Sequence, residues 1–178
     1  MNQYQFKDVL YMKKGRALTV DNEEKETVGI IEKEDIAGCE KGHVFSFTAN
    51  DGAKIVMGIK KRGIKDFLVA KYVVKMAEET YMLKDKVGNN LLYFCVEGNI
   101  EGENIRVEEN WSREIEVKVS KTHIATIKPS NDLSFKTIIL IGTHIHEKSI
   151  YFAISVLMYF MYKIYKNESD FIENILFD

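Results

Sequence analysis

Hydrophobic and polar residues alternate over short stretches along most of the chain, and one long apolar run lies near its C-terminal end. The run Ser149–Tyr162 (SIYFAISVLMYFMY) carries apolar side chains on every face of a helix. A helix without a polar stripe is buried in a protein core or in a membrane. At about 1.5 Å per residue the run spans about 21 Å, whereas a bilayer core is about 30 Å thick. The pattern predicts a buried core helix at residues 147–166. A membrane segment and a strand are the weaker alternatives.

The residues before this helix predict short strands separated by turns. The clearest hairpin joins 44–49 to 54–59 through an Asp51-Gly52 turn, which is expected to take positive φ at both central positions. At 111–119 three apolar residues alternate with charged ones, which is typical of a half-buried antiparallel strand. Strands are predicted at 4–12, 16–20, 27–32, 44–49, 54–59, 67–76, 80–83, 91–96, 105–108, 111–119, 123–128 and 135–141, loops at 35–42 and 98–103, and a final short helix or docked tail at 167–178.

These elements together predict a mainly β fold with one helix. Many short strands with turn signals form a sandwich or a barrel. A barrel of about twelve strands is too wide for its own side chains to fill, and an all-round apolar helix would fill it. We therefore predict a closed antiparallel barrel around a buried, hydrophobic C-terminal helix, as a single domain over residues 1–178.

Composition and charge narrow the classes of function. The chain has 25 basic and 27 acidic side chains, and the net charge of −2 gives no reason to expect nucleic-acid binding. Two isolated cysteines, Cys39 and Cys95, favour reduced thiols and a cytoplasmic protein, although a disulfide between them remains an alternative. The first residues contain no apolar segment after a basic start, so no secretory signal is expected. No transmembrane segment is expected either.

The sequence carries no motif of a known catalytic or cofactor-binding type. No G-x-S-x-G, Walker-type loop, G-x-G-x-x-G or zinc-ligand spacing occurs. Carboxylate pairs such as Glu78 and Glu79 are adjacent in sequence, so on strands they point to opposite faces. We expect no enzyme activity, no catalytic residue and no cofactor, and an uncharacterised enzyme is the weaker alternative. Trp111 and the tyrosines could form a belt facing lipid or another ligand, but core packing is the default interpretation.

Two basic turns are the candidate ligand-binding residues. Phosphate oxygens of an anionic lipid would attract them, at about 1 kcal/mol for each basic side chain near a charged surface. The alternative is that they are solvated hairpin ends. The candidates are Lys60, Lys61, Arg62 and Lys65 in one turn, and Lys13, Lys14 and Arg16 in the other.

His144 and His146 are two residues apart, and on an extended segment they would share a face and could chelate a metal. A third ligand would have to come from elsewhere, and ordinary polar residues at a strand-to-helix junction are the favoured alternative. No metal is therefore predicted. Ser149 is placed to cap the start of the helix.

Three segments repeat the order strand, Asp-containing turn, Gly and apolar strand. They are LTVDNEEKETVGII (18–31), FTANDGAKIVM (47–57) and YMLKDKVGNNLLYF (81–94), and the succession continues through 111–141 to the closing apolar helix. From about residue 4 to 166 this order resembles the tubby C-terminal-like superfamily, in particular its small LURP-one-related branch. Phospholipid scramblases are similar in fold.

The resemblance implies a closed barrel of about twelve strands around a central C-terminal helix. Tubby proteins bind phosphoinositide head groups through surface Lys and Arg, scramblases act on phospholipid and carry a calcium-binding segment, and most bacterial relatives have no assigned activity. This chain departs from the better-known branches. No tubby lipid-site motif matches residue by residue, no cysteine cluster for palmitoylation occurs, and 143–148 (THIHEK) is not an acidic calcium loop.

We therefore expect a non-enzymatic tubby-like domain, cytoplasmic or peripheral to the membrane. It would bind an anionic phospholipid, or another phosphate-bearing ligand, at the barrel surface. The alternative is a protein-interaction or structural domain without lipid affinity, whose partner is a protein.

Overall fold

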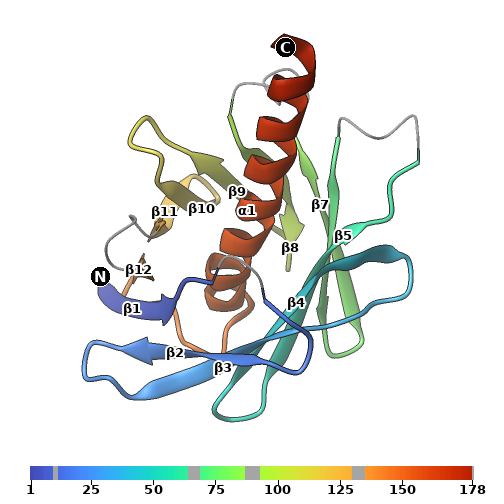
Figure 1. Cartoon of the computed structure of the whole chain (residues 1–178). Coiled ribbons are helices and arrows are strands. Elements are labelled where there is room, and N and C mark those ends of the chain that lie inside the picture. Colours follow the sequence, from blue (N-terminus) through green and yellow to red (C-terminus); the bar gives the residue numbers. More distant parts are fainter. Residues whose placement is uncertain (10–11, 64–68, 87–92, 130–134, 178) are drawn as a thin grey trace.

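The computed structural model describes residues 1–9, 12–63, 69–86, 93–129 and 135–177, with the backbone alone at 171–177. These residues form twelve strands followed by one helix (Figure 1). In chain order the elements are β1 (Asn2–Lys7), β2 (Ala17–Asn22), β3 (Thr27–Lys33), β4 (Cys39–Ala49), β5 (Lys54–Lys60), β6 (Lys71–Met76), β7 (Glu79–Asp85), β8 (Cys95–Ile100), β9 (Glu103–Glu109), β10 (Ile115–Val119), β11 (Thr122–Lys128), β12 (Lys136–Ile141) and α1 (Ile150–Phe177).

Each strand pairs antiparallel with its neighbour in sequence, and β1 also pairs with β12, which closes the barrel. In the closing pair Tyr4 lies opposite Ile139 and Phe6 opposite Thr137. Closure leaves no exposed sheet edge among these strands. The predicted fold class, a closed antiparallel barrel with one C-terminal helix, is confirmed.

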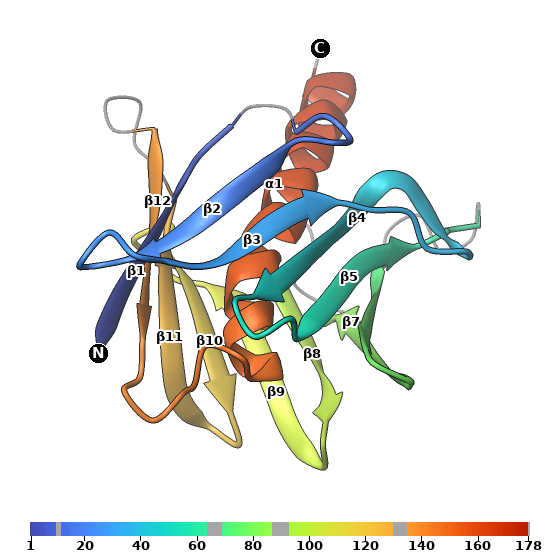
Figure 2. The ribbon, with the colours of Figure 1, turned by 90° about the horizontal axis from the view of Figure 1, so that it is seen from below.

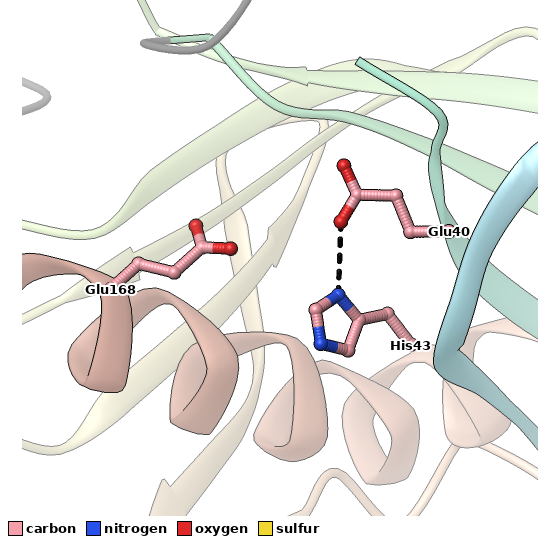
Figure 3. Close-up of side chains that lie close together, drawn as sticks. All are labelled: Glu40, His43 and Glu168. Atoms are coloured by element: carbon pink, nitrogen blue, oxygen red, sulfur yellow. Dashed lines mark hydrogen bonds and ion pairs between the residues drawn. The ribbon is translucent and has the colours of Figure 1, made fainter.

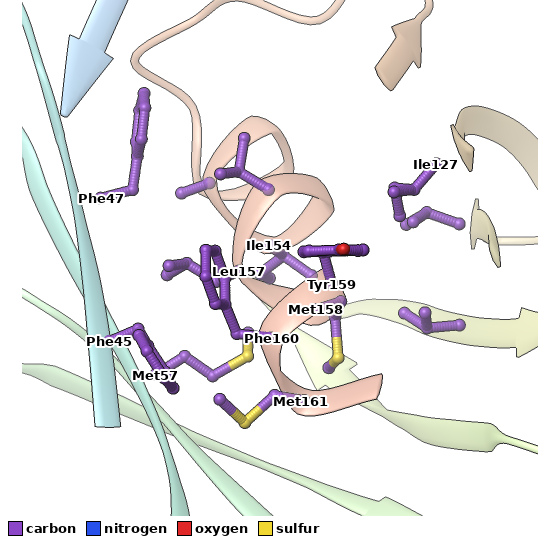
Figure 4. Close-up of a cluster of buried hydrophobic side chains, with 14 of the residues drawn as sticks. Phe45, Phe47, Met57, Ile127, Ile154, Leu157, Met158, Tyr159, Phe160 and Met161 are labelled. Carbon is purple, nitrogen blue, oxygen red and sulfur yellow. The ribbon is translucent and has the colours of Figure 1, made fainter. Parts of the chain in front are cut away.

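The helix fills the barrel, as the apolar run predicted. Phe152, Ile154 and Leu157 have no solvent-exposed surface. Figure 4 shows the helix side chains packed against strand residues such as Phe45 and Met57. The rings of Phe45 and Phe160 are stacked with their centroids 4.6 Å apart. Burial on every side of the helix explains why its sequence has no polar stripe.

Polar groups of the helix form hydrogen bonds at its start and at the point where it leaves the barrel. The hydroxyl of Ser149 accepts a hydrogen bond from the backbone N–H of Phe152 at 3.2 Å, so the predicted cap is confirmed. The hydroxyl of Tyr162 donates to Glu109 at 2.7 Å, and that of Tyr159 donates to Asp8. These tyrosines satisfy their hydroxyls at the point where the helix leaves the barrel.

Several predicted boundaries were wrong. The predicted loop at 35–42 contains the start of β4, where a register shift between Cys39 and Val44 relaxes the pairing with β5. The predicted loop at 98–103 is mostly strand, because Ile100 is fully buried and β8 continues to it. Parts of the predicted strands 4–12, 67–76 and 91–96 lie outside the described residues; within the described part, β1 already ends at Lys7 and β6 begins at Lys71.

Two further expectations about local backbone differ from the structure. The hairpin between β4 and β5 has positive φ at Gly52 (89°) and not at Asp51, so it is a turn in which only the glycine is left-handed. The separate final helix or tail is also wrong. One helix continues to Phe177, since no Gly or Pro interrupts the sequence after Lys163.

The alternating strand directions sort the connections to two ends of the barrel. The β1–β2, β3–β4, β5–β6, β7–β8, β9–β10 and β11–β12 connections lie at one end, where the C-terminal half of α1 emerges. We call it the helix-exit end. Figures 1 and 2 both place the last turns of α1 beyond the strands. The remaining hairpins and the segment 142–149 lie at the opposite end.

Candidate functional surface

Charge is distributed unequally between the two ends of the barrel. Among the described connections of the helix-exit end, basic side chains outnumber acidic ones: Lys13, Lys14, Arg16, Lys61, Arg62, Lys86 and Arg113 against Asp8, Glu34, Asp35 and Glu114. The opposite end has the reverse balance: Glu23, Glu24, Glu26, Asp51, Glu78, Glu101 and Glu147 against Lys25, Lys121 and Lys148. The net charge of the chain is small, but the described connections of one barrel end carry an excess of basic side chains and those of the other end an excess of acidic ones.

The acidic side chains of the helix-exit connections are already neutralised by cations. Asp8 pairs with Lys163 at 2.7 Å, Asp35 pairs with Lys14 at 2.5 Å, and Glu114 pairs with Lys128 at 3.3 Å. The fourth, Glu34, pairs with a lysine of β5. Within these connections, the charges left without a partner are therefore basic.

Both predicted basic turns lie at the helix-exit end. Lys13, Arg16 and Lys61 are exposed and form no ion pair with any residue that the structure describes, and the same holds for Lys60 at the end of β5. Lys14 is exposed and paired with Asp35. Lys65 lies outside the described residues.

Arg62 differs from the other members of its predicted cluster. Its side chain is only 11% exposed and lies between Glu40 of β4 and Glu168 of α1. Its Nε donates to Oε1 of Glu40 at 2.7 Å, and its Nη1 donates to Oε2 of Glu168 at 2.9 Å. Arg62 thus ties the emerging helix to the barrel wall instead of facing solvent.

His43 completes this group, and Figure 3 shows it beside Glu40 with Glu168 facing both from the helix. The Nδ1 atom of His43 lies 3.0 Å from Oε2 of Glu40. Burial alone would raise the pKa of Glu40, but hydrogen bonds from Arg62 and His43 outweigh it and hold that pKa below its ordinary value. One ligand atom from each of Glu40, His43 and Glu168 lies within 4.8 Å of the others. A metal ion would therefore fit only if the Arg62 guanidinium left the carboxylates.

The structure also exposes two large hydrophobic side chains at the helix-exit end. Trp111, in the β9–β10 connection, is fully exposed at 105%, and Phe135, in the β11–β12 connection, is exposed at 60%. The prediction that Trp111 lies in a strand and packs in the core was wrong. The Oδ1 atom of Asn110 accepts from the backbone N–H groups of Ser112 and Glu114, which forms a turn and delays β10 until Ile115.

A pocket of about 330 Å³ lies beside Trp111, because Ser112, the next residue in the chain, is part of its lining. It is lined by Ser112, Arg113, Glu114, Lys128, Pro129 and Tyr162. Arg113 is exposed and forms no ion pair with a described residue, whereas Lys128 forms an ion pair with Glu114. No local pattern in the sequence marks this group, because Arg113 and Lys128 are isolated basic residues, one in the β9–β10 connection and one at the end of β11. Pairing of β10 with β11 brings them together.

The two histidines before α1 do not lie on an extended segment. Residues 143–149 form two consecutive turns, closed by backbone hydrogen bonds from Ile145 to Gly142 and from Ser149 to His146. The premise of the chelation hypothesis, a shared strand face, does not hold. Among the described residues, neither His144 nor His146 belongs to a group of three ligands within metal-binding distance.

One buried carboxylate lies close to the Arg62 group. Asp85 accepts hydrogen bonds from the backbone N–H of Ala70 at 2.7 Å and from the hydroxyl of Tyr72 at 2.9 Å. Burial raises the pKa of Asp85, and these two donors partly offset the effect. Because one donor, Ala70, directly precedes β6 and the other, Tyr72, belongs to it, this carboxylate of β7 holds the start of β6 in place.

Comparison of the chain with protein-family models, with curated proteins and with solved structures found no match. The resemblance to tubby-like domains therefore stays a prediction from the sequence. Over the described residues, the helix does not combine the length and hydropathy that crossing a bilayer requires.

Proposed function

We propose that this barrel binds anionic phospholipid through its helix-exit end. The observation that supports the proposal is the placement of both basic turns at that one end, where the acidic side chains of the described connections are already paired. A negatively charged bilayer is a flat surface and attracts a cluster of exposed cations without a shaped cleft.

The expected affinity is modest. Lys13, Arg16, Lys60, Lys61 and Arg113 are exposed and have no acidic partner among the described residues. At about 1 kcal/mol for each such side chain near an anionic surface, they supply about 5 kcal/mol. Binding of this strength is reversible and peripheral, and it weakens as salt screens the charges.

Sedimentation with vesicles tests the proposal. The protein is mixed at low salt with phosphatidylserine–phosphatidylcholine vesicles and, separately, with phosphatidylcholine vesicles. We expect the protein to pellet with the anionic vesicles alone. The double variant Lys13→Glu/Arg16→Glu should lose this binding. Lys25→Glu/Lys121→Glu makes the same change in net charge at the opposite end and should retain it. Equal recovery with both vesicle types would overturn the proposal.

A protein partner is the second candidate function. The observation that favours it is the exposed Trp111 beside Arg113, since Trp and Arg are enriched among the residues that dominate protein interfaces. This candidate predicts a stable partner in a pull-down that is unaffected by the Lys13→Glu/Arg16→Glu change and lost with Trp111→Ala, together with no preference for anionic vesicles.

A further inference from the structure

We propose that Trp111 and Phe135 insert into the interfacial layer of an anionic membrane, with Arg113 and Lys128 meeting the head-group phosphates beside them. This inference rests on the proposed function and names the side chains that would give the contact its apolar part.

The exposure of these two residues is unusual for the molecule. Among the described residues, the large hydrophobic side chains that are exposed are Met1, Met82, Trp111 and Phe135. Met1 is the first residue and Met82 lies on the barrel wall in β7, so the two exposed aromatic residues of this set are both at the helix-exit end. An indole left fully in water forgoes a large apolar contact, which marks Trp111 as available for a partner.

Trp111 and Phe135 lie on neighbouring connections. Because β10 pairs with β11 and β11 with β12, the β9–β10 and β11–β12 connections adjoin. The β1–β2 connection comes next, since the backbone N–H of Asp8 donates to the carbonyl of Phe135 at 2.7 Å. This third connection carries Lys13 and Arg16, which have no ion-pair partner in the part of the chain that the structure describes. Two aromatic side chains and a set of cations thus follow one another along a single arc of the rim.

The pocket beside Trp111 provides the polar part of the contact. The guanidinium of Arg113 has no ion-pair partner among the described residues, so it can donate paired hydrogen bonds to phosphate oxygens. Lys128 adds a second cation, although it forms an ion pair with Glu114, and Ser112 adds a hydroxyl. An indole ring suits the layer between head groups and acyl chains, because its faces are apolar while its N–H can bond to water or a carbonyl.

Charge complementarity favours a membrane over a protein as the occupant. The acidic connections of the barrel lie at the opposite end, and those at the helix-exit end are paired. An anionic bilayer would therefore be attracted by this end and repelled by the other. Such a field would orient the barrel so that Trp111 and Phe135 meet the lipid.

The intrinsic fluorescence of the protein gives a direct test, because Trp111 is the single tryptophan of the chain. Phosphatidylserine–phosphatidylcholine vesicles should shift its emission to shorter wavelength and protect it from acrylamide. Vesicles with brominated acyl chains should quench it. Soluble glycerophosphoserine, which offers the head group without a bilayer, should produce neither protection nor shift.

The outcomes separate this inference from the proposed function. If the protein pellets with anionic vesicles while the emission stays at its aqueous position, insertion of Trp111 is wrong and lipid binding stands. If glycerophosphoserine alone reproduces the full shift, the site binds a soluble phosphate and insertion is again wrong. If the protein does not pellet, the proposed function fails and this inference fails with it.

Substitutions give an independent measure. Trp111→Ala and Phe135→Ala should each lower the affinity for anionic vesicles by about tenfold, because each removes a large apolar side chain from the buried contact. Met82→Ala removes an exposed apolar side chain from the barrel wall, at 42% exposure, and should leave binding unchanged. Thermal melting that matches the wild type shows that each variant is folded. Unchanged affinity in both aromatic variants would overturn the inference.

Discussion

Arg62 illustrates how a single residue can be misassigned from a run of like charges. In sequence it belongs with Lys60 and Lys61, but in the fold its guanidinium is shared between Glu40 and Glu168. Lys60 and Lys61, which precede it in the run, are exposed. A local cluster of positive charge therefore contains one residue that stabilises the fold and others that are free to contact a ligand.

Replacement of this arginine should destabilise the protein. Arg62→Met keeps the length of the side chain but leaves two half-buried carboxylates without a counter-charge. We expect the free energy of unfolding to fall by about 2 kcal/mol, less than for a fully buried pair because both carboxylates reach solvent. Urea denaturation measures the change. Lys61→Met is the matched control and should lie within about 0.5 kcal/mol of wild type; equal midpoints for the two variants would contradict the assignment.

The ion pair of Arg62 with Glu40 should also make the stability of the fold sensitive to acid. The pKa of Glu40 is lowered in the folded state from an ordinary value of 4.5. Its contribution to stability is therefore present above pH 4.5 and is lost as the pH falls through the lower folded pKa. We expect the free energy of unfolding to drop more between pH 7 and pH 3.5 in the wild type than in Arg62→Met. Denaturation curves at both pH values test this, and parallel losses would exclude a role for the pair.

At the scale of an element, the barrel wall depends on glycines placed under bulky neighbours. Gly98 of β8 lies opposite Leu83 of β7. A Cβ atom at this position would stand 2.4 Å from Cδ2 of Leu83 and 2.9 Å from the carbonyl oxygen of Met82. The second of these is a backbone atom, so a shift of the Leu83 side chain alone would not relieve the contact.

Gly98→Ala should therefore strain the β7–β8 pair. We expect a loss of about 1–3 kcal/mol in the free energy of unfolding, the usual cost of overpacking. Gly63→Ala serves as the control, because no atom of the described residues lies within 4 Å of a Cβ at Gly63 and its φ is not positive. Thermal and urea unfolding of the two variants should differ clearly, and a stable Gly98→Ala would show that β7 and β8 can separate without cost.

The central helix is the element with the largest expected effect. Leu157 is fully buried, with strands around it. Leu157→Ala should lower the free energy of unfolding by about 3 kcal/mol through lost burial and a cavity. Leu157→Asp, or Phe160→Asp, should prevent folding because an unpaired carboxylate would be buried. Asn167→Ala, on the exposed part of the helix, is the control. A soluble Asp variant with unchanged melting would refute the central position of the helix.

For the molecule as a whole, the two ends of the barrel differ in sign of charge, and this predicts how salt acts on vesicle binding. The exposed cations of the helix-exit end act across a Debye length of about 10 Å at 0.1 M salt and about 3 Å at 1 M. We expect binding to anionic vesicles to weaken steeply between low salt and about 0.5 M. The emission shift of Trp111 should decline in parallel, because the charges hold the aromatic side chains at the surface. Binding that is insensitive to salt would contradict an electrostatic attachment.

Much of this architecture could be predicted from the sequence. Burial of one face of a strand, or of every face of a helix, shows directly in the local order of apolar and polar residues. This is why the alternation at 44–49 and 54–59 and the apolar run at 149–162 predicted their elements correctly. Loop boundaries were less legible. Cys39 and Ile100 belong to strands because their neighbours across the sheet pair with them, and no local signal marks that.

The sequence by itself determined that strands close around a C-terminal helix, since a helix apolar on all faces needs a wall on all faces. The tertiary structure alone decided which basic residues are free, because the partner of Arg62 on the helix is 106 positions away in the chain. It also decided that Trp111 is exposed and that Arg113 and Lys128 meet beside it. Those facts depend on where closure of the barrel brings distant connections, and closure is a property of the whole sheet.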